Sequence, residues 1–338
     1  MHIVIIGSGI AGITFAEKMR SLSPDAKITL LSRENQGYYS RPMLSRGFST
    51  PDIDRKIILK PFATLLEKNI CVIGGISVTR IDRNSRRLYI QGAEDLETLS
   101  YDKLVLAPGS DAFIPPPLQP YRELFFILNS LVDLQRLRKF RQPFLDRQHA
   151  PRWAIIGGGL IGCEVASDLA FAGDKVTVFH AMDRLMERQL VAEDSAKLLE
   201  VLQDSSVQVL LNQSVQALRK NGGKIQVVTS DSGSDFDAVL VACGFKPRTQ
   251  LAADAGLETG RGIKVDQFLQ SSDENIYVLG DAAELPNGKL YAFILPIRHQ
   301  ANWLAARLSD QQTQPWQPPA FNPKAKVHGF EAAHPYLF

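Results

Sequence analysis

The feature that most constrains this chain of 338 residues is a glycine-rich segment that occurs twice. The first, Gly7-Ser8-Gly9-Ile10-Ala11-Gly12, follows the apolar run 2–6. The second, Gly157-Gly158-Gly159-Leu160-Ile161-Gly162, follows the apolar run 153–156. A strand, a glycine turn and a helix in this order bind the diphosphate of a dinucleotide. Two dinucleotide-binding units are therefore predicted in one chain.

The three glycines of each motif have different physical roles. The first permits a tight turn, the second lets the backbone approach the diphosphate, and the third lets helix and strand pack closely. The N-terminus of the following helix then stabilises the negative charge. These glycines are Gly7, Gly9 and Gly12 in the first unit and Gly157, Gly159 and Gly162 in the second.

The pattern around each motif extends it into a strand–helix–strand unit. Residues 13–20 and 163–172 carry apolar side chains at helical spacing, and residues 27–31 and 175–179 form the next apolar runs. Continuous apolar runs are typical of strands buried on both faces of a parallel sheet. Further strands are expected at 104–107 and 276–279, and a last helix at about 297–308. The fold class is therefore α/β with two Rossmann-like domains.

Composition excludes several other classes of protein. Lysine and arginine number 38 against 36 acidic residues, a balance untypical of a dedicated nucleic-acid binder. The three cysteines, Cys71, Cys163 and Cys243, are far apart in sequence, so neighbouring cysteines form no dithiol centre. No metal site is expected. No apolar run is long enough for a membrane span, and the first strand follows Met1 directly, so we expect a cytoplasmic protein.

The acid that normally binds the adenosine ribose lies about 20 residues after the glycine turn. In the first unit Ser32 occupies the usual place and Glu34 follows, either as the ribose ligand or as a solvated loop residue. In the second unit His180 replaces the acid, either touching the cofactor or lying in a polar loop. Arg184 is the nearby cation, and Glu187 would repel a 2′-phosphate, which favours NADH over NADPH.

Two carboxylates allow two interpretations each. Glu164 follows the second glycine turn, as a helix-start glutamate favoured by the helix dipole or as a group facing the redox centre. Asp281 follows the run 276–279, as an N-cap or as an acceptor for a ribityl hydroxyl, and the two roles can coexist.

Several segments resemble motifs of one family when taken together. They are Tyr38-Tyr39-Ser40-Arg41-Pro42-Met43-Leu44-Ser45, Leu106-Ala107-Pro108-Gly109, Gly157 to Glu164, Ala242-Cys243-Gly244-Phe245-Lys246-Pro247 and Leu279-Gly280-Asp281. From residue 1 to about 308 the chain resembles the FAD- and NAD(P)H-dependent pyridine nucleotide oxidoreductases, and within them the rubredoxin reductases.

The resemblance implies which part of the chain binds which cofactor. FAD is expected on residues 1–110 and 241–310 and NADH on 111–240, with 311–338 as a tail or vestigial C-terminal domain. The C-terminal interface domain of the family is expected to be largely missing. Arg41 and Pro42 are expected along the FAD diphosphate, Val78 at the adenine, and Pro296 and Ile297 at a helix start that faces the flavin.

The full set of candidate cofactor-binding residues combines the two turns with the resemblance. It comprises Gly7, Gly9, Ile10, Ala11, Gly12, Ser32, Glu34, Arg41, Pro42, Val78, Ala107, Pro108, Gly109, Gly157, Gly159, Leu160, Ile161, Gly162, Gly244, Gly280, Asp281, Pro296 and Ile297.

The resemblance also implies a reaction and its residues. Glu164 matches a glutamate near nicotinamide and flavin, and Arg46 lies where relatives place a lysine that pairs with it. The predicted enzyme is an FAD-dependent NAD(P)H reductase that passes electrons from NADH through flavin to a small acidic carrier such as rubredoxin or ferredoxin. A partner that covers an open flavin face is a further expectation. The alternatives are an NADH oxidase or diaphorase using oxygen or quinone, and a flavin-binding redox-sensing interaction protein.

Overall fold

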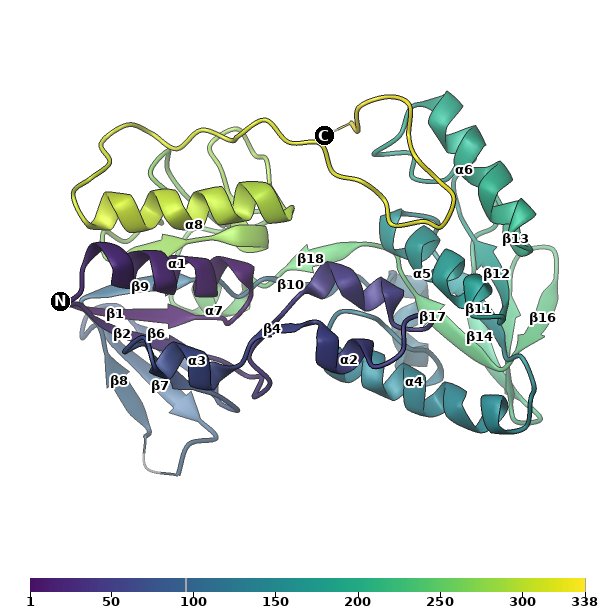
Figure 1. Cartoon of the computed structure of the whole chain (residues 1–338), viewed down its shortest axis with the longest axis horizontal. Coiled ribbons are helices and arrows are strands. Elements are labelled where there is room, and N and C mark those ends of the chain that lie inside the picture. The colour runs from purple at the N-terminus through teal and green to yellow at the C-terminus, as the bar shows by residue number, and fades with distance from the viewer. Residues whose placement is uncertain (95, 338) are drawn as a thin grey trace. The chain divides into compact units, whose positions relative to one another are not determined.

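The computed structural model describes residues 1–94 and 96–337, and the chain forms two compact units (Figure 1). The first unit comprises Met1–Ser40, Ile58–Asp111 and Lys246–Phe321. The second comprises Arg41–Ile57, Ala112–Phe245 and the chain from residue 322. The segment Arg41–Ile57, which the sequence places inside the first 110 residues, thus packs with the second unit.

The first unit is built on a five-stranded parallel sheet in the order β20-β9-β1-β2-β5. The central strand β1 is the apolar run of the N-terminus, and Ile3, Val4 and Ile5 are fully buried because both faces of the sheet are covered. Its strands are β1 (His2–Ile6), β2 (Lys27–Leu31), β5 (Cys71–Ile73), β9 (Lys103–Leu106) and β20 (Ile276–Val278).

Helices α1 (Ile10–Leu22) and α8 (Ile294–Leu308) lie side by side on this unit, although they are almost 300 residues apart (Figure 1). The other elements form small sheets and turns around this core. They are β3 (Tyr38–Tyr39), β4 (Ile58–Lys60), α3 (Phe62–Leu66), β6 (Ser77–Asp82), β7 (Arg87–Gln91), β8 (Thr98–Ser100), α7 (Gln250–Asp254), β19 (Ile263–Lys264), the 3-10 turn η3 (Gly280–Ala282) and β21 (Ala283–Glu284).

The second unit repeats the design with a four-stranded parallel sheet in the order β13-β12-β11-β17. Its strands and helices are β11 (Arg152–Ile156), α5 (Leu160–Phe171), β12 (Lys175–Phe179), α6 (Ala192–Asp204), β13 (Val207–Leu210) and β17 (Ala238–Val241). Around them lie η1 (Arg41–Arg46), α2 (Ile53–Lys56), η2 (Pro116–Leu124), α4 (Leu131–Asp146), β14 (Ala217–Asn221), β15 (Lys224–Val228) and β16 (Gly233–Phe236). The chain passes between the units in β10 (Ser110–Ala112) and β18 (Phe245–Pro247).

The predicted α/β fold with two Rossmann-like sheets is confirmed. The runs 2–6, 27–31 and 175–179 form strands with the predicted bounds. The strands predicted at 153–156 and 276–279 differ by one residue at one end, and the strand predicted at 104–107 is shifted by one residue. The helices predicted from residues 13, 163 and 297 begin three residues earlier, at Ile10, Leu160 and Ile294. The proline-rich segment after residue 111 does more than link the units, because Leu118 is buried in the core of the second one.

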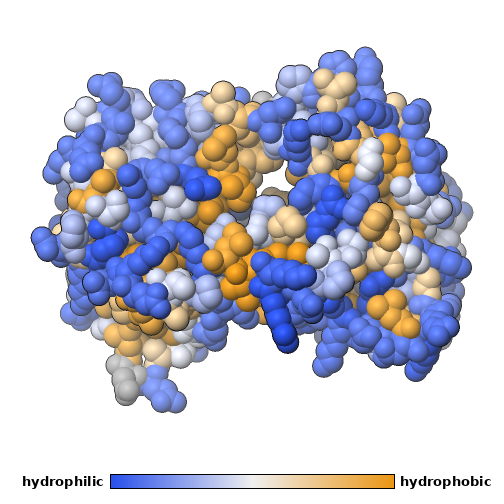
Figure 2. Space-filling model, in the orientation of Figure 1, coloured by the Kyte–Doolittle hydropathy of each residue, from blue (hydrophilic) through white to orange (hydrophobic). Residues whose placement is uncertain are grey.

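The surface of each unit is mostly hydrophilic on the face shown in Figure 2, with small hydrophobic patches among the charged residues. In the described ranges 1–94 and 96–337, none of the helices has the length and apolar character needed to cross a lipid bilayer.

Candidate functional site

The first glycine turn has the shape that a bound diphosphate requires. Gly7 has φ of +115°, and a Cβ there would lie 2.0 Å from the carbonyl oxygen of Ala107. A Cβ on Gly12 would lie 2.0 Å from the oxygen of Gly7, so strand and helix touch through their backbones. A Cβ on Gly9 would meet nothing within 4 Å. Gly9 also starts α1 without a side-chain cap, which leaves helix N–H groups available to an anion.

Ser32, the residue that follows β2, packs against the first glycine turn. Ser32 is buried, and its hydroxyl lies 2.7 Å from that of Ser8 in the turn. Ser32 also accepts a hydrogen bond from the backbone of Glu34 (3.0 Å), whose carboxylate accepts another from Tyr39 (2.7 Å). Glu34 is therefore held in place by its neighbours and is not simply a solvated loop residue.

The Gly280-Asp281 segment shows a second feature that suits FAD. Asp281 lies inside the short turn η3, whose N-cap is Leu279, so the N-cap interpretation of Asp281 is wrong. Its carboxylate accepts a hydrogen bond from Ser110 (2.7 Å). The fully buried Gln300 accepts a hydrogen bond from the Gly280 N–H (2.9 Å), but its Nε2 has no partner in the described part of the chain. A buried donor of this kind fits a site that a polar ligand completes.

The remaining candidates of the first unit lie on short backbone segments. Ala107 donates its N–H to Ile6, and Arg248 binds the carbonyl oxygens of Pro108 (2.8 Å) and, through its own N–H, of Gly109 (3.0 Å). Val78 lies in β6, an edge strand, so backbone groups on its other side are not used by that sheet. Pro296 and Ile297 are buried in the first turns of α8.

The second glycine turn repeats the geometry of the first. Gly157 has φ of +113°, and a Cβ there would lie 2.5 Å from the oxygen of Ala242. A Cβ on Gly162 would lie 1.9 Å from the oxygen of Gly157, whereas one on Gly159 would meet nothing within 4 Å. Leu160 and Ile161 open α5, which has no side-chain N-cap. Both turns therefore fit a dinucleotide.

Glu164, in the first turns of α5, is a fully buried carboxylate with a full set of donors. Lys326 Nζ lies 2.6 Å from both of its oxygens, and the backbone N–H of Lys326 donates to Oε1 (2.9 Å). The hydroxyl of Ser45 in η1 donates to Oε2 (2.6 Å). A buried carboxylate is stable only when it is paired and hydrogen-bonded, and these three donors meet that need.

The predicted ion pair between Arg46 and Glu164 is wrong, because Lys326 supplies the cation. Arg46 instead donates to the imidazole of His328, two residues beyond Lys326. The same imidazole lies 3.2 Å from the buried Asp168, one turn after Glu164 in α5, and stacks on Phe171 with ring centroids 4.1 Å apart.

Arg41, the other candidate of η1, donates to the carbonyl oxygen of Asn129 (2.6 Å). Pro42 follows it in η1, and Gly244 has φ of +107°.

Two of the three cysteines, Cys163 and Cys243, have the character of structural residues. Burial raises the pKa of the Cys163 thiol, and the neighbouring Glu164 carboxylate raises it further. Burial also raises the pKa of Cys243 to about 11. Both thiols therefore stay protonated near neutral pH, where a thiol is a poor nucleophile. All three cysteines are free.

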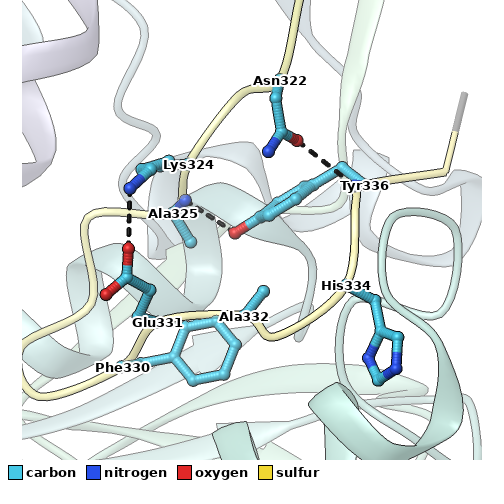
Figure 3. A pocket seen from close by; sticks show the side chains of 8 residues that line it. All are labelled: Asn322, Lys324, Ala325, Phe330, Glu331, Ala332, His334 and Tyr336. Carbon is cyan, nitrogen blue, oxygen red and sulfur yellow. Dashed lines mark hydrogen bonds and ion pairs between the residues drawn. The ribbon is translucent and has the colours of Figure 1, made fainter.

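The tail from residue 322 is anchored to the second unit at several points beside α5 and α6 (Figure 1). His328 donates its N–H to Ser167 (2.9 Å), and the N–H groups of Ala333 (2.8 Å) and His334 (2.9 Å) donate to Asp194 at the start of α6. The tail also folds on itself around a cavity of about 140 Å³. There the hydroxyl of Tyr336 accepts a hydrogen bond from Ala325 (2.8 Å), and Lys324 pairs with Glu331 (Figure 3).

We expect acidification to release the end of this tail. Burial tends to raise the pKa of Asp194, but the hydrogen bonds from Ala333 and His334 outweigh it and hold the pKa below its usual range. The stabilisation is therefore present above the ordinary pKa of an aspartate and is lost as pH falls through the lowered one. Asp194→Asn should speed hydrogen exchange at the Ala333 and His334 amides about tenfold at pH 7, because hydrogen bonds to a charged acceptor are lost. Asp204→Asn, at the exposed end of α6, is the matched control, and equal exchange in both variants would contradict the anchor.

Sequence reasoning missed Lys326, Ser45, His328, Asp168 and Asp194. Ser45 lies at the end of the motif 38–45, next to Arg46, but nothing in the pattern indicates a hydroxyl partner rather than a guanidinium one. Lys326 lies 162 residues after Glu164, in a segment without periodicity that could place it. The signal that was available is the presence of Lys326 and His328, two potential cations, in a tail otherwise rich in proline.

Two glycine turns of this geometry on two parallel sheets define an oxidoreductase of the class that binds two dinucleotides. The chain belongs to the pyridine nucleotide-disulphide oxidoreductase family, whose model matches residues 1–306. It is an FAD-dependent enzyme that oxidises NADH.

Two curated relatives match nearly the whole chain. A rubredoxin-NAD(+) reductase of Alcanivorax borkumensis is 35% identical over 318 residues, 93% of this chain and 80% of the relative. A nitric oxide reductase FlRd-NAD(+) reductase of Escherichia fergusonii is 35% identical over 330 residues, 96% of this chain and 83% of the relative.

Solved structures show the same fold. Putidaredoxin reductase, in a covalent complex with putidaredoxin, is 26% identical with a TM-score of 0.85, covering 97% of this chain and 79% of that one. A ferredoxin reductase from Rhodopseudomonas palustris is 28% identical with a TM-score of 0.83, covering 94% of this chain and 78% of that one.

Proposed function

We propose that this enzyme passes electrons from NADH through FAD to a small one-electron carrier protein of the rubredoxin or iron–sulfur type. The observation that carries the proposal is that its curated relatives at 35% identity are named as rubredoxin-NAD(+) and FlRd-NAD(+) reductases over almost the whole chain. The free cysteines support it, because no disulfide joins them as a two-electron relay. We also propose that the enzyme works in the cytoplasm.

The residues of the two turns would hold the cofactors. Gly7 and Gly9, with the start of α1, would bind the diphosphate of FAD, and Asp281 would accept a ribityl hydroxyl. Gly157 and Gly159, with the start of α5, would bind the diphosphate of NADH. Bound FAD supplies the redox chemistry, accepting a hydride from NADH and releasing electrons to the carrier.

We propose that Glu164 is the catalytic carboxylate of the second unit and that Lys326, rather than Arg46, is its counter-ion. The Lys326 ammonium lies 2.6 Å from both oxygens of the buried Glu164 carboxylate, and the Ser45 hydroxyl fixes the direction of that carboxylate. A fixed negative charge of this kind can stabilise the positive charge of the oxidised nicotinamide ring. Arg46 donates to the imidazole of His328 and is not the counter-ion of Glu164.

An acidic carrier needs a basic docking surface. The sequence holds two basic runs that could form such a surface: Arg80, Arg83, Arg86 and Arg87, and Arg136, Arg138, Lys139 and Arg141. In the first run, Arg80 stacks on Tyr89, and Arg83 and Arg86 lie 4.0 Å from Asp273 and Glu274. On α4, Arg136 and Lys139 are exposed.

The expected α4 surface is smaller than the sequence suggested. Arg141 is buried and binds both oxygens of Asp174, so the prediction that it belongs to a docking surface is wrong. Arg138 lies 3.3 Å from Asp54. We therefore propose Arg136 and Lys139 as the docking cations for the carrier.

The test is anaerobic reduction of a purified rubredoxin by NADH and the enzyme, compared with NADH oxidation under oxygen. We expect carrier reduction to be far faster than oxygen consumption, and to slow several-fold when the salt is raised from low to physiological ionic strength. Arg136→Glu/Lys139→Glu should slow carrier reduction about tenfold and leave flavin reduction by NADH unchanged. Arg86→Glu/Arg87→Glu is the matched control. Equal rates of NADH oxidation with oxygen and with the carrier would support an NADH oxidase instead.

A further inference from the structure

The end of β12 lacks the acid that normally binds the adenosine ribose, and His180 in its place has no hydrogen-bonding capacity to spare. Its Nδ1 accepts a hydrogen bond from the Gly158 N–H (3.0 Å), so Nε2 carries the proton of the neutral ring. That Nε2 faces the carbonyl oxygen of Arg184 (3.0 Å) and the carboxylate of Glu187 (3.2 Å). A ribose hydroxyl would find neither ring nitrogen free.

The buried His180 ring explains why residue 158, between the motif glycines Gly157 and Gly159, is also a glycine. A Cβ on Gly158 would lie 2.5 Å from Leu185 and 2.8 Å from the His180 ring. In the first unit small side chains occupy the equivalent positions: Ser8 pairs with Ser32, and the acid Glu34 follows Ser32 by two residues. In the second unit the histidine fills that space, and the carboxylate of Glu187, seven residues further on, lies 3.2 Å from its Nε2.

The loop that carries Glu187 is fixed by its own contacts. Arg184 binds the carbonyl oxygens of Leu190 (2.7 Å) and Glu187 (2.9 Å), and Met186 donates its N–H to Gly158 (2.9 Å). The guanidinium of Arg184 is therefore occupied inside the loop and is a poor candidate to bind a phosphate. The Glu187 side chain, with 21% of its surface exposed, stays accessible beside the His180 ring.

We propose that Glu187 is the specificity-determining residue of the NADH site, replacing the missing acid at the end of β12. Its carboxylate would accept hydrogen bonds from the adenosine ribose hydroxyls, and its charge would repel the 2′-phosphate of NADPH. This inference rests on NADH binding to the second unit, as in the proposed function, and is independent of the electron acceptor.

The test measures dissociation constants of NAD⁺ and NADP⁺ for the FAD-loaded enzyme by calorimetry, without turnover. Glu187→Gln should weaken NAD⁺ binding about tenfold, because hydrogen bonds to a charged acceptor are replaced by weaker ones. Glu187→Arg should shift the preference toward NADP⁺ by about 100-fold or more, because an arginine can bind the 2′-phosphate.

Asp183→Asn is the matched control, because Asp183 is an exposed carboxylate in the same loop. Its two constants should stay within about twofold of the wild type. An unchanged NAD⁺ to NADP⁺ ratio in Glu187→Arg, or an equal shift in Asp183→Asn, would overturn the inference. Failure of the wild-type enzyme to bind either nucleotide would instead contradict the proposed function, so the two failures are distinct.

Discussion

Replacing Gly159 by alanine is expected to weaken NADH binding by up to about 150-fold in a protein that stays folded and yellow. A Cβ at this position meets nothing within 4 Å in the protein, and Gly159 has φ of −78°, which alanine adopts readily. The methyl group therefore costs the fold little, but it lies where the backbone must approach the diphosphate. A methyl group forced into a close contact costs about 1–3 kcal/mol, or roughly a 5- to 150-fold loss of affinity.

Gly9→Ala is the reciprocal variant and control. Gly9 is equally open and has φ of −70°, so this substitution should lower the flavin content and leave NAD⁺ binding in the second unit intact. Flavin content is read from the absorbance of the purified protein, and NAD⁺ affinity from calorimetry. If Gly159→Ala lost its flavin and Gly9→Ala lost NAD⁺ instead, the assignment of the two cofactors would be reversed.

The strands of the two sheets could be predicted because the physical constraint is local. A run such as residues 2–6 must be buried on both faces, and the glycine after it ends the strand with a positive φ. The starts of α1 and α5 were predicted three residues too late, and the reason is equally local. The predicted helices began after the last glycine of each motif, whereas the second glycine is the N-cap and the third already lies in the helix.

The partner of Glu164 could not be predicted, because its position depends on the fold of the tail. The family resemblance alone implied a cationic partner for Glu164, and it indicated Arg46, which lies where relatives place a lysine. The structure brings Lys326 to Glu164 across 162 residues and turns Arg46 toward His328. Arg141 shows the same limit, since a basic run on a helix does not reveal which of its members faces the interior.

Removing the cation from Glu164 is expected to destabilise the second unit strongly. Lys326→Met leaves a fully buried carboxylate without its counter-ion, and breaking a buried ion pair by removing one partner costs about 3–5 kcal/mol. Glu164→Gln should cost less, because the Lys326 side chain is 26% exposed and its ammonium can turn toward water. Urea-induced unfolding of each variant measures these free energies.

The double variant Glu164→Gln/Lys326→Met tests whether the two residues act as a pair. It should be more stable than Lys326→Met alone, because no unpaired charge is left buried, and the free energies of the four proteins then give the coupling directly. Lys324→Met is the matched control in the same tail, because Lys324 is 72% exposed in its pair with Glu331 and such surface pairs contribute little to stability. Glu164→Gln should also slow flavin reduction by NADH in stopped-flow measurements, through loss of the fixed charge beside the nicotinamide. Additive losses in the cycle would refute the pairing, and flavin reduction at the wild-type rate in a folded Glu164→Gln enzyme would refute the catalytic role while leaving the structural pair intact.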